Sequence, residues 1–520
     1  MKKMVTLILS LCLVCTLFVG AASAGTILPN GRYDKLVVAV DVDPQDLEGD
    51  DVNVNPRYYW IYGIYETLFD FADDSSGALV PCMAEDYEVI DDGMAWKVTL
   101  KPDVYDWDGN NITASDVKYC FDWIINRGQA LRFDFFDSIE VVDDYTFIMH
   151  WTTVPPAISE LEFPLTRTLI WSEKAYNDHN GMTQDPCGTG CYKVTEFMPG
   201  SKLVMEANDD YWGLKYPELT GRHTATVQTL ELNTVTEAST AVIGLEQGKL
   251  DVCAYVPLAM LDEFQTGAQS ENYTVEIVTQ GDYWYMAPNV QNVNLDLRKA
   301  IFYATESATL CKAMGGSFVA ATTIGTEAFS DYDPSLEMTG TYITDYDVEL
   351  AKRYVASSGY DGRELVILTP NSETSSKATQ MLQAMLLQAG INSKINAVTF
   401  DIFNTLTSAA HSDEWDIMVT TLGGPNMVGS WHLLFDHEVN DGYTFSMAQD
   451  PTLHELYEAA CADATHDAEH MRACLDHVIE SAYVYPIAKI STGLVYTKDI
   501  EQMYFREGYY TPGAATFRAQ

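Results

Sequence analysis

Positive charge is scarce in this sequence. Its 520 residues include 30 Lys and Arg against 75 Asp and Glu, so the formal net charge is −45. Binding to nucleic-acid phosphates requires a basic surface, and this balance excludes a nucleic-acid partner. The acidity favours either the steering of cationic ligands or high solubility in a salty environment, and solubility is the simpler interpretation.

Catalytic signatures are absent as well. The chain contains no G-x-S-x-G and no H-E-x-x-H motif, and no cysteine stands in a recognisable nucleophile signature. An enzyme, for example an exported hydrolase, is therefore the weaker hypothesis, and a binding role without a cofactor is favoured. No internal repeat or low-complexity segment occurs.

Long apolar runs are missing except at the N-terminus. Lys2 and Lys3 precede an apolar stretch from Met4 to Gly20, which is followed by Ala22-Ser23-Ala24. A basic start, a short apolar middle and small residues at the cleavage site predict a secretory signal peptide over residues 1–24. An uncleaved signal anchor is the alternative, because the run is marginal in length for a membrane span.

The predicted location of the mature protein is therefore outside the cytoplasmic membrane, in the periplasm or at the cell surface. Val14 precedes Cys15 where a bacterial lipoprotein site has a small residue, so lipidation is not predicted. Outside the signal peptide eight cysteines remain: Cys82, Cys120, Cys187, Cys191, Cys253, Cys311, Cys461 and Cys474. An even number in an exported chain permits disulfides without proving them.

Hairpins and an aromatic helix are predicted for the first part of the chain. Residues 35–42 read as a strand, and 58–71 (YYWIYGIYETLFDF) as an aromatic-rich helix. Asp91-Asp92-Gly93 and Asp143-Asp144 each stand between alternating segments, which indicates two hairpins. Thr113 with Asp116 three residues later is typical of a capped helix start.

Strands alternate with helices from residue 229 onward, after two more strands within 194–207. The expected strands are 229–235, 250–256, 364–370 and 415–421, and the expected helices are 236–247, 295–305, 347–357 and 375–389. Such alternation predicts an α/β protein, with a more antiparallel insert near 80–200.

Five stretches resemble motifs of one family. Residues 65–117 carry YETLFDF and then LVPCMAEDYEVIDDGMAWKVTLKPDVYDWDGNNITASDV, and 188–213 read GTGCYKVTEFMPGSKLVMEANDDYWG. Residues 236–251 are TEASTAVIGLEQGKLD, 296–306 are DLRKAIFYATE and 347–362 are DVELAKRYVASSGYDG. In this order they resemble the family 5 extracytoplasmic solute-binding proteins of peptide and nickel ABC transporters.

The resemblance implies a two-lobed periplasmic-binding-protein type II fold with an extra domain inserted in lobe I. Lobe I would comprise 25–286, including the insert near 80–200, and 489–520, while lobe II would comprise 287–488. It also implies a capture protein, because two lobes that close on a ligand link binding energy to a shape that a transporter recognises.

The turn Gly423-Gly424-Pro425-Asn426 is the first expected ligand contact, since this turn reaches the cleft from lobe II in the family. Peptide-binding members typically carry an acidic residue there, whereas nickel-binding members have a W-G-x-P-like turn. No carboxylate occurs between Asp416 and Asp436 here, and Leu422 stands where the second pattern has Trp. The glycines either offer backbone hydrogen bonds to a ligand or only make a tight turn.

Other ligand candidates follow from their positions in the resemblance. Arginines could hold a carboxylate through a bidentate fork, or form a structural salt bridge. Aromatic rings near the lobe crossover would stack on a ligand, or pack in the core. The candidates are Arg57, Tyr58, Arg167, Tyr283, Trp284 and Trp431.

Metal binding is the alternative within the same class. His432 and His437 follow the turn, roughly where nickel-type members carry a metal-associated histidine. A zinc site from Cys461, His466, His470 and Cys474 is a weaker hypothesis than the Cys461–Cys474 disulfide found at comparable spacing in some members. A small disulfide loop between Cys187 and Cys191 is a further possibility, or one of these thiols is simply buried.

The sequence thus predicts the substrate-binding component of an ABC importer. It would capture peptides or a similar solute and deliver them to the permease and ATPase subunits, as a monomer at the outer face of the cytoplasmic membrane. Nickel or metal-chelate capture is the alternative in the same family, and a ligand-sensing receptor the alternative in another class.

Overall fold

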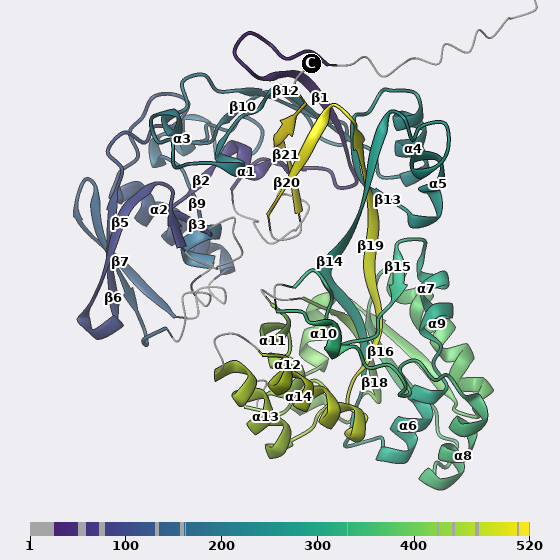
Figure 1. Ribbon diagram of the computed structural model, residues 1–520. Coiled ribbons are helices and arrows are strands. Elements are labelled where there is room, and N and C mark those ends of the chain that lie inside the picture. The colour runs from purple at the N-terminus through teal and green to yellow at the C-terminus, as the bar shows by residue number, and fades with distance from the viewer. Residues whose placement is uncertain are drawn as a thin grey trace, which may run out of the picture.

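Two bodies joined by long strands make up the computed structural model (Figure 1). The structure describes residues 25–49, 59–71, 79–129, 135–155, 161, 163–329, 331–423, 426–438, 442–462, 467–506 and 509–518. The predicted signal peptide, residues 1–24, lies outside the described residues. Within them no helix is long and apolar enough to cross a membrane.

An eleven-stranded sheet runs through both bodies. Its order is β10 (Tyr192–Met198), β11 (Lys202–Ala207), β12 (Val227–Thr234), β1 (Tyr33–Val40), β13 (Val252–Val256), β19 (Tyr485–Thr497), β14 (Tyr273–Pro288), β18 (Ile417–Leu422), β16 (Leu365–Pro370) and β17 (Ser393–Val398), with β15 (Phe318–Ala320) on β19. β14 and β19 are antiparallel from Tyr273↔Thr497 to Met286↔Tyr485. These two strands carry the chain between the bodies (Figure 1).

A separate antiparallel sheet belongs to the first body. Its order is β5 (Ala84–Ile90), β6 (Ala95–Leu100), β8 (Thr146–Trp151) and β7 (Phe136–Asp143). Asp92 and Gly93 take positive φ in the turn between β5 and β6, so the predicted hairpin there is confirmed. Thr113 and Asp116 form the predicted capping box of α2 (Ala114–Ile124), in which each side chain accepts from the other's backbone.

Three small ribbons complete the strands. They are β2 (Glu66–Thr67) with β9 (Leu169–Ile170), β3 (Phe69–Phe71) with β4 (Leu79–Pro81), and β20 (Ile500–Arg506) with β21 (Tyr509–Phe517). The helices of the first body besides α2 are α1 (Ile61–Ile64), α3 (Glu173–Asp178), α4 (Ala238–Glu246) and α5 (Asp262–Gln265).

Helices are denser in the second body, around β16, β17 and β18. They are α6 (Leu295–Tyr303), α7 (Ser307–Met314), α8 (Val348–Ser358), α9 (Glu373–Gln388), α10 (Phe400–Leu406), α11 (Met427–Ser430), α12 (His432–Phe435), α13 (Pro451–Ala462) and α14 (Ala468–Ser481). β16 is parallel to both β17 and β18, as the predicted strand–helix alternation requires.

Each body has its own hydrophobic core. The first core takes residues from Tyr33 to Val252 and again from Leu494 to Ala515. The second takes residues from Tyr283 to Ala488. Independent cores are what two lobes need in order to move relative to one another. The boundaries 25–286, 287–488 and 489–520 stay a prediction.

The helix predicted over 58–71 is wrong. The described part of this segment contains the single turn α1, and Glu66 to Phe71 lie in β2 and β3. Nearly every side chain from Trp60 to Asp70 is buried, so the segment has no solvent-facing side on which an amphipathic helix would place polar residues. Pairing with β9 and β4 satisfies the backbone instead.

Candidate functional site

The carboxyl end of β18 leads into the turn that the sequence singled out. β18 ends beside β14, where Leu422 pairs with Tyr283, and Gly423 follows. Gly424 and Pro425 lie outside the described residues. Asn426 caps α11, because its side-chain oxygen accepts a hydrogen bond from the Gly429 backbone N–H at 2.6 Å.

Two carboxylates reach this turn from other segments. Asp331 accepts backbone N–H groups of Met427 at 2.6 Å and Val428 at 3.0 Å, at the first residues of α11. Asp282 lies against Gly423, since a Cβ added to that glycine would stand 2.1 Å from the Asp282 Oδ1. The turn without an acid of its own therefore has two acids beside it. Neither acid can be recognised from the sequence around the turn, because each is about a hundred residues or more away along the chain.

A polar cluster lies where β14 and β19 run from one body to the other. Lys489 and Glu327 form an ion pair at 2.6 Å, and Thr279 donates to Glu327 at 3.1 Å. The Thr279 and Ser491 hydroxyls are 2.9 Å apart. Burial is the largest influence on Glu327 and opposes its ionisation, but the hydrogen bonds it accepts and the charge of Lys489 together lower the pKa of Glu327. The cluster lies next to the shift in β14 register between Thr279 and Tyr283.

Three of the four candidate aromatic residues, Tyr283, Trp284 and Trp431, pack in the core of the second body. Tyr283 and Trp431 are fully buried, and the Tyr283 hydroxyl is 3.1 Å from that of Ser430. The Trp431 indole N–H donates to the Ile324 carbonyl at 2.6 Å. Trp284 is 7 % exposed and meets the edge of Phe318. In this structure these three rings therefore pack in the core, which was the alternative to stacking on a ligand.

The candidate arginine and histidine side chains are dispersed. Arg57 and Tyr58 lie outside the described residues, and Arg167 is half-buried at the end of a one-turn π-helix, Phe163–Arg167. His432 is exposed, with its Nδ1 2.9 Å from the Gly429 carbonyl oxygen. The buried Nδ1 of His437 has no hydrogen-bond partner among the described residues. Neither histidine belongs to a group of three metal-ligating side chains in the described part of the chain.

The eight cysteines within the described residues stand as thiols in this structure. Cys187 and Cys191 are both buried, and the Cys191 thiol lies 3.6 Å from the Arg222 carbonyl oxygen. The small disulfide loop between them stays a prediction. Cys461 is exposed on α13, Cys474 is buried on the adjoining α14, and no bond joins them. Burial raises the pKa of Cys474 to about 12. His466 lies outside the described residues, and the Cys461–Cys474 disulfide stays a prediction.

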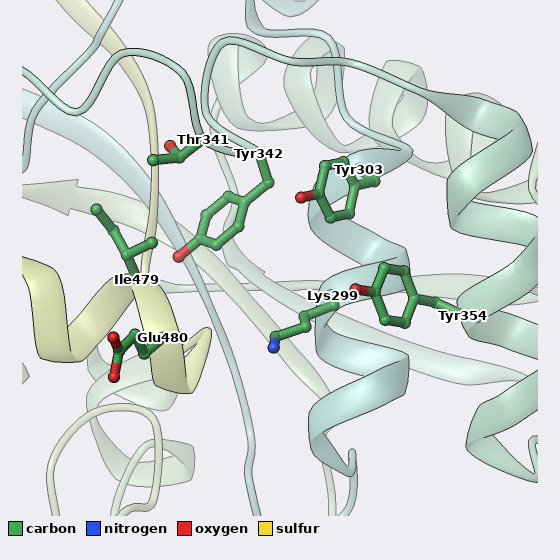
Figure 2. Close-up of a pocket in the computed structure, with 7 residues that line it drawn as sticks. All are labelled: Lys299, Tyr303, Thr341, Tyr342, Tyr354, Ile479 and Glu480. Atoms are coloured by element: carbon green, nitrogen blue, oxygen red, sulfur yellow. The ribbon is translucent and has the colours of Figure 1, made fainter.

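A pocket of about 250 Å³ opens on the second body, between α6, α8 and α14. Figure 2 shows Lys299 and Glu480 on opposite sides of it and the ring of Tyr342 between them. The full lining is Lys299, Tyr303, Thr341, Tyr342, Tyr354, Ile479 and Glu480. Ligand pockets usually hold about 300–1,000 Å³, so this one is too small for a peptide.

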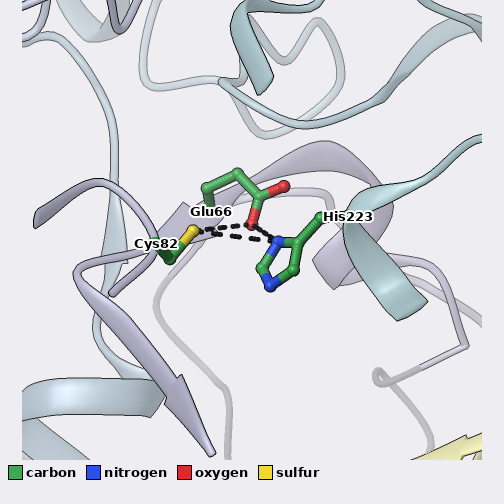
Figure 3. A group of neighbouring side chains, drawn as sticks. All are labelled: Glu66, Cys82 and His223. Atoms are coloured by element: carbon green, nitrogen blue, oxygen red, sulfur yellow. Dashed lines mark hydrogen bonds and ion pairs between the residues drawn. The ribbon is translucent and has the colours of Figure 1, made fainter. Parts of the chain in front are cut away.

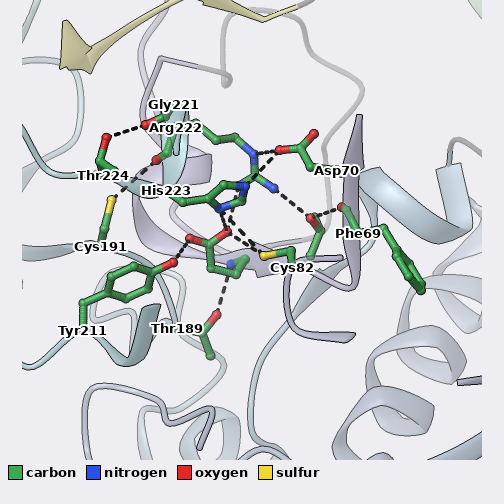
Figure 4. Close-up of polar contacts among 12 residues, drawn as sticks. Phe69, Asp70, Cys82, Thr189, Cys191, Tyr211, Gly221, Arg222, His223 and Thr224 are labelled. Carbon is green, nitrogen blue, oxygen red and sulfur yellow. Dashed lines mark hydrogen bonds and ion pairs between the residues drawn. The ribbon is translucent and has the colours of Figure 1, made fainter. Parts of the chain in front are cut away.

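A buried charge network occupies the first body and was not expected from the sequence. The Glu66 carboxylate lies 2.8 Å from the His223 Nδ1 and 3.5 Å from the Cys82 sulfur (Figure 3). Arg222 pairs with Glu66 at 2.9 Å and also with Asp70 (Figure 4). β2, β3 and the short 3₁₀ turn Gly221–His223 bring these residues together.

The network is balanced by its own cations. Burial opposes the charge of Glu66, but the cations of His223 and Arg222 outweigh it and lower the pKa of Glu66. Burial and Arg222 oppose protonation of His223, yet the Glu66 carboxylate and a hydrogen bond to Asp70 raise its pKa well above the ordinary value. Two carboxylates therefore face two cations, which leaves no net negative charge to attract a metal ion. The network's role is to hold β2, β3 and the turn at 221–223 together.

A family model matches most of the chain. The model described as bacterial extracellular solute-binding proteins, family 5 Middle, covers residues 78–435. The chain belongs to this family. Its members are substrate-binding proteins of ABC transporters, so the predicted class is confirmed: an extracytoplasmic protein that binds a small solute and works with a permease. The family is one of binding proteins and not of enzymes.

Relatives and solved structures agree with this assignment. The glutathione-binding protein GsiB of Salmonella paratyphi A is 26 % identical over 392 residues, 73 % of this chain and 72 % of the relative. The oligopeptide-binding protein OppA of Bacillus subtilis is 21 % identical and covers 97 % of this chain and 99 % of itself. The structure of HbpA2 from Haemophilus parasuis has a TM-score of 0.73 at 18 % identity, over 94 % of this chain and 100 % of its own. The predicted two-lobed fold is thereby confirmed.

Proposed function

We propose that this family 5 protein captures short peptides and that Asp282 holds the ligand's α-ammonium group. The single observation that carries the proposal is the contact between the Asp282 carboxylate and Gly423 at the carboxyl end of β18. In the family that the sequence resembles, this turn faces the ligand. A carboxylate within reach of it replaces the acid that the turn itself lacks.

The named ligands of relatives support a peptide. GsiB is a glutathione-binding protein and OppA an oligopeptide-binding protein. Backbone N–H and C=O groups at Gly423 would pair with the peptide backbone. Lys489 and Thr279 lie on the strands that join the lobes, and both contact Glu327. Closure around the ligand would present the loaded form to the permease and ATPase subunits.

The mature protein acts as a monomer outside the cytoplasmic membrane in this proposal. Residues 1–24 either leave as a signal peptide or remain as an anchor. A receptor that passes its ligand to a sensor uses the same binding chemistry, and import of labelled ligand in cells with and without the permease separates the two roles.

The first test is mass spectrometry of small molecules released from gently purified, denatured protein, with metal analysis of the same sample. Recovered peptides support the proposal. Stoichiometric nickel or a metal chelate, lost in His432→Gln or His437→Gln, overturns it in favour of the metal-binding alternative.

Calorimetric titration of the residues 25–520 protein tests the role of Asp282. Asp282→Asn should weaken a recovered peptide about ten- to a hundredfold, because a charge-assisted hydrogen bond contributes about 1.5–3 kcal/mol. The N-acetylated peptide lacks the ammonium group, so it should bind both proteins equally. The matched control is Asp413→Asn, an exposed aspartate of the second body. Equal losses for free and acetylated peptide would contradict the assignment of Asp282.

A further inference from the structure

A second group of metal-ligating side chains lies in the first body and shares no residue with the buried network. Asp108, His179 and Cys187 each place one ligand atom within 4.8 Å of the other two. Asp108 is in the loop after β6, His179 ends α3 and Cys187 is in the loop before β10. Oxygen, nitrogen and sulfur donors therefore converge from three segments.

The imidazole of His179 is held in a specific orientation. Its Nδ1 is 2.9 Å from Asp185 Oδ2, and its Nε2 is 3.0 Å from Asp108 Oδ2. Zinc-ligating histidines almost always bond a carboxylate or carbonyl through the second ring nitrogen, which fixes the tautomer and the ring plane. When Nε2 faces the ion, Asp185 is the carboxylate that bonds the second ring nitrogen, Nδ1.

The loops that carry the ligands are fixed independently of any ion. The Trp107 N–H donates to the Gly188 carbonyl at 3.0 Å, which ties the Asp108 loop to the Cys187 loop. Asp106 accepts the backbone N–H groups of Asp108 at 3.0 Å and Asn110 at 2.8 Å. The ligand-bearing backbone is thus organised in advance, and only side chains need to move to close on an ion.

The charge around the cluster is negative. Among the described residues the only ion-pair partner of Asp108 and of Asp185 is the His179 imidazole. Exposure falls from 47 % for the Asp108 side chain through 21 % for His179 to 1 % for Cys187. A cation would reach the cluster from solvent through Asp108 and meet the buried sulfur last.

We propose that Asp108, His179 and Cys187 bind a Zn²⁺ ion, with Asp185 as the positioning residue of His179. Mixed sulfur, nitrogen and oxygen donors suit Zn²⁺, whereas Mg²⁺ and Ca²⁺ prefer oxygen alone. Tetrahedral zinc with bonds of about 2.0–2.3 Å sets its ligands about 3.3–3.8 Å apart, so closing the cluster requires small side-chain shifts. The site is independent of the proposed peptide site in lobe II, and it would fasten the Asp108 loop to the loop that follows α3.

The test is calorimetric titration of metal-free residues 25–520 protein with Zn²⁺, together with Co²⁺ absorption spectroscopy. One zinc ion per chain is expected, with a thiolate-to-cobalt charge-transfer band that disappears in Cys187→Ser. His179→Gln and the exposed Asp108→Asn should weaken zinc more than a hundredfold. Asp185→Asn should weaken it about ten- to a hundredfold and keep the cobalt band.

Two matched controls locate the ion. His454→Gln removes the histidine of another cluster, Asp436, His454 and Glu458, and Cys253→Ser removes a buried thiol elsewhere in the first body. Both should bind zinc like the parent. Absence of zinc binding, or zinc lost in His454→Gln and kept in His179→Gln, overturns the proposal. Asp108→Asn tests it even if Cys187→Ser fails to fold.

Discussion

Two clusters in the first body contain the same three kinds of side chain and differ in their surroundings. Glu66, Cys82 and His223 are all buried, while the cluster of Asp108, His179 and Cys187 runs from exposed to buried. The first includes Arg222 and the second includes a further carboxylate, Asp185. An arginine inside a group of potential ligands supplies the positive charge that a metal would otherwise bring.

Charge balance, and not residue type, therefore separates a structural ion network from a cation site. Around Glu66 two carboxylates face Arg222 and His223, and nothing further is needed. Around Asp108 two carboxylates face one imidazole and a buried thiol. The four predictions that follow test this difference, in order of decreasing effect.

The largest effect is expected from Arg222→Met. Removal of one partner from a buried ion network leaves uncompensated charge in the protein interior, so stability should fall by about 3–5 kcal/mol. Urea denaturation followed by circular dichroism measures the loss. Arg472→Met, which breaks a surface pair with Asp476, is the matched control and should cost below about 1 kcal/mol. Equal losses in the two variants would contradict the role of the network.

Asp251 extends the comparison to a half-buried acid without an ion-paired cation in the described part of the chain. Burial raises its pKa to about 6, although the Val37 N–H donates to it at 2.7 Å. An aspartate in the unfolded chain has a pKa of about 3.9, so between about pH 3.9 and pH 6 the folded state binds more protons than the unfolded state. The free energy of unfolding therefore falls as pH rises through about 6, where the folded carboxyl ionises. Asp251→Asn should therefore be more stable than the parent by up to about 3 kcal/mol at pH 7.

Unfolding midpoints of Asp251→Asn and the parent, measured from pH 3.5 to pH 7.5, check this sign. The difference should vanish near pH 4 and be complete above pH 7, because only then is the folded carboxyl fully ionised. A difference that stays constant over this range would contradict the raised pKa.

Zinc should raise the stability of the folded protein by binding at the second cluster, and the first cluster should contribute nothing to this gain. At a free zinc concentration one hundred times Kd, binding to the folded state alone adds about 2.7 kcal/mol to its stability. Thermal unfolding with zinc and with a chelator measures this gain. His179→Gln should abolish it and Cys82→Ser should keep it. The reverse pattern would place the ion in the buried network.

The smallest effect is expected from Asp185→Asn without metal. The Asp185 side chain is 82 % exposed, so its ion pair with His179 is screened by water and contributes below about 1 kcal/mol. Denaturation in chelator measures it. A larger loss would mean that the imidazole between two carboxylates stabilises the fold by itself, without an ion.

Local signals predicted much of the fold correctly. Thr113 and Asp116 lie three residues apart and cap α2, and the turn at Asp92 and Gly93 joins β5 to β6, because each interaction is complete within a few residues. Such signals can be recognised in a single sequence. The segment 58–71 was misread because its burial comes from neighbours far along the chain, and its aromatic residues fit a helix and a buried strand equally well.

The candidate site was predicted only in part. The sequence located the turn after β18 and its lack of an acid, but the acids beside it come from Asp282 and Asp331 on other segments. It also selected Tyr283 and Trp431 by position, and their burial follows from how β14 and α11 pack.

The sequence by itself determined the family, the net negative charge and the order of most strands and helices, and it predicts the export signal. Only the tertiary structure decided which charged groups meet, since Glu66 and His223 are 157 residues apart and Asp108 and His179 are 71 apart. The physical reason is that an ion pair, or a set of metal ligands, depends on distances of a few ångströms. Those distances are set by packing between segments and leave no mark in the local sequence.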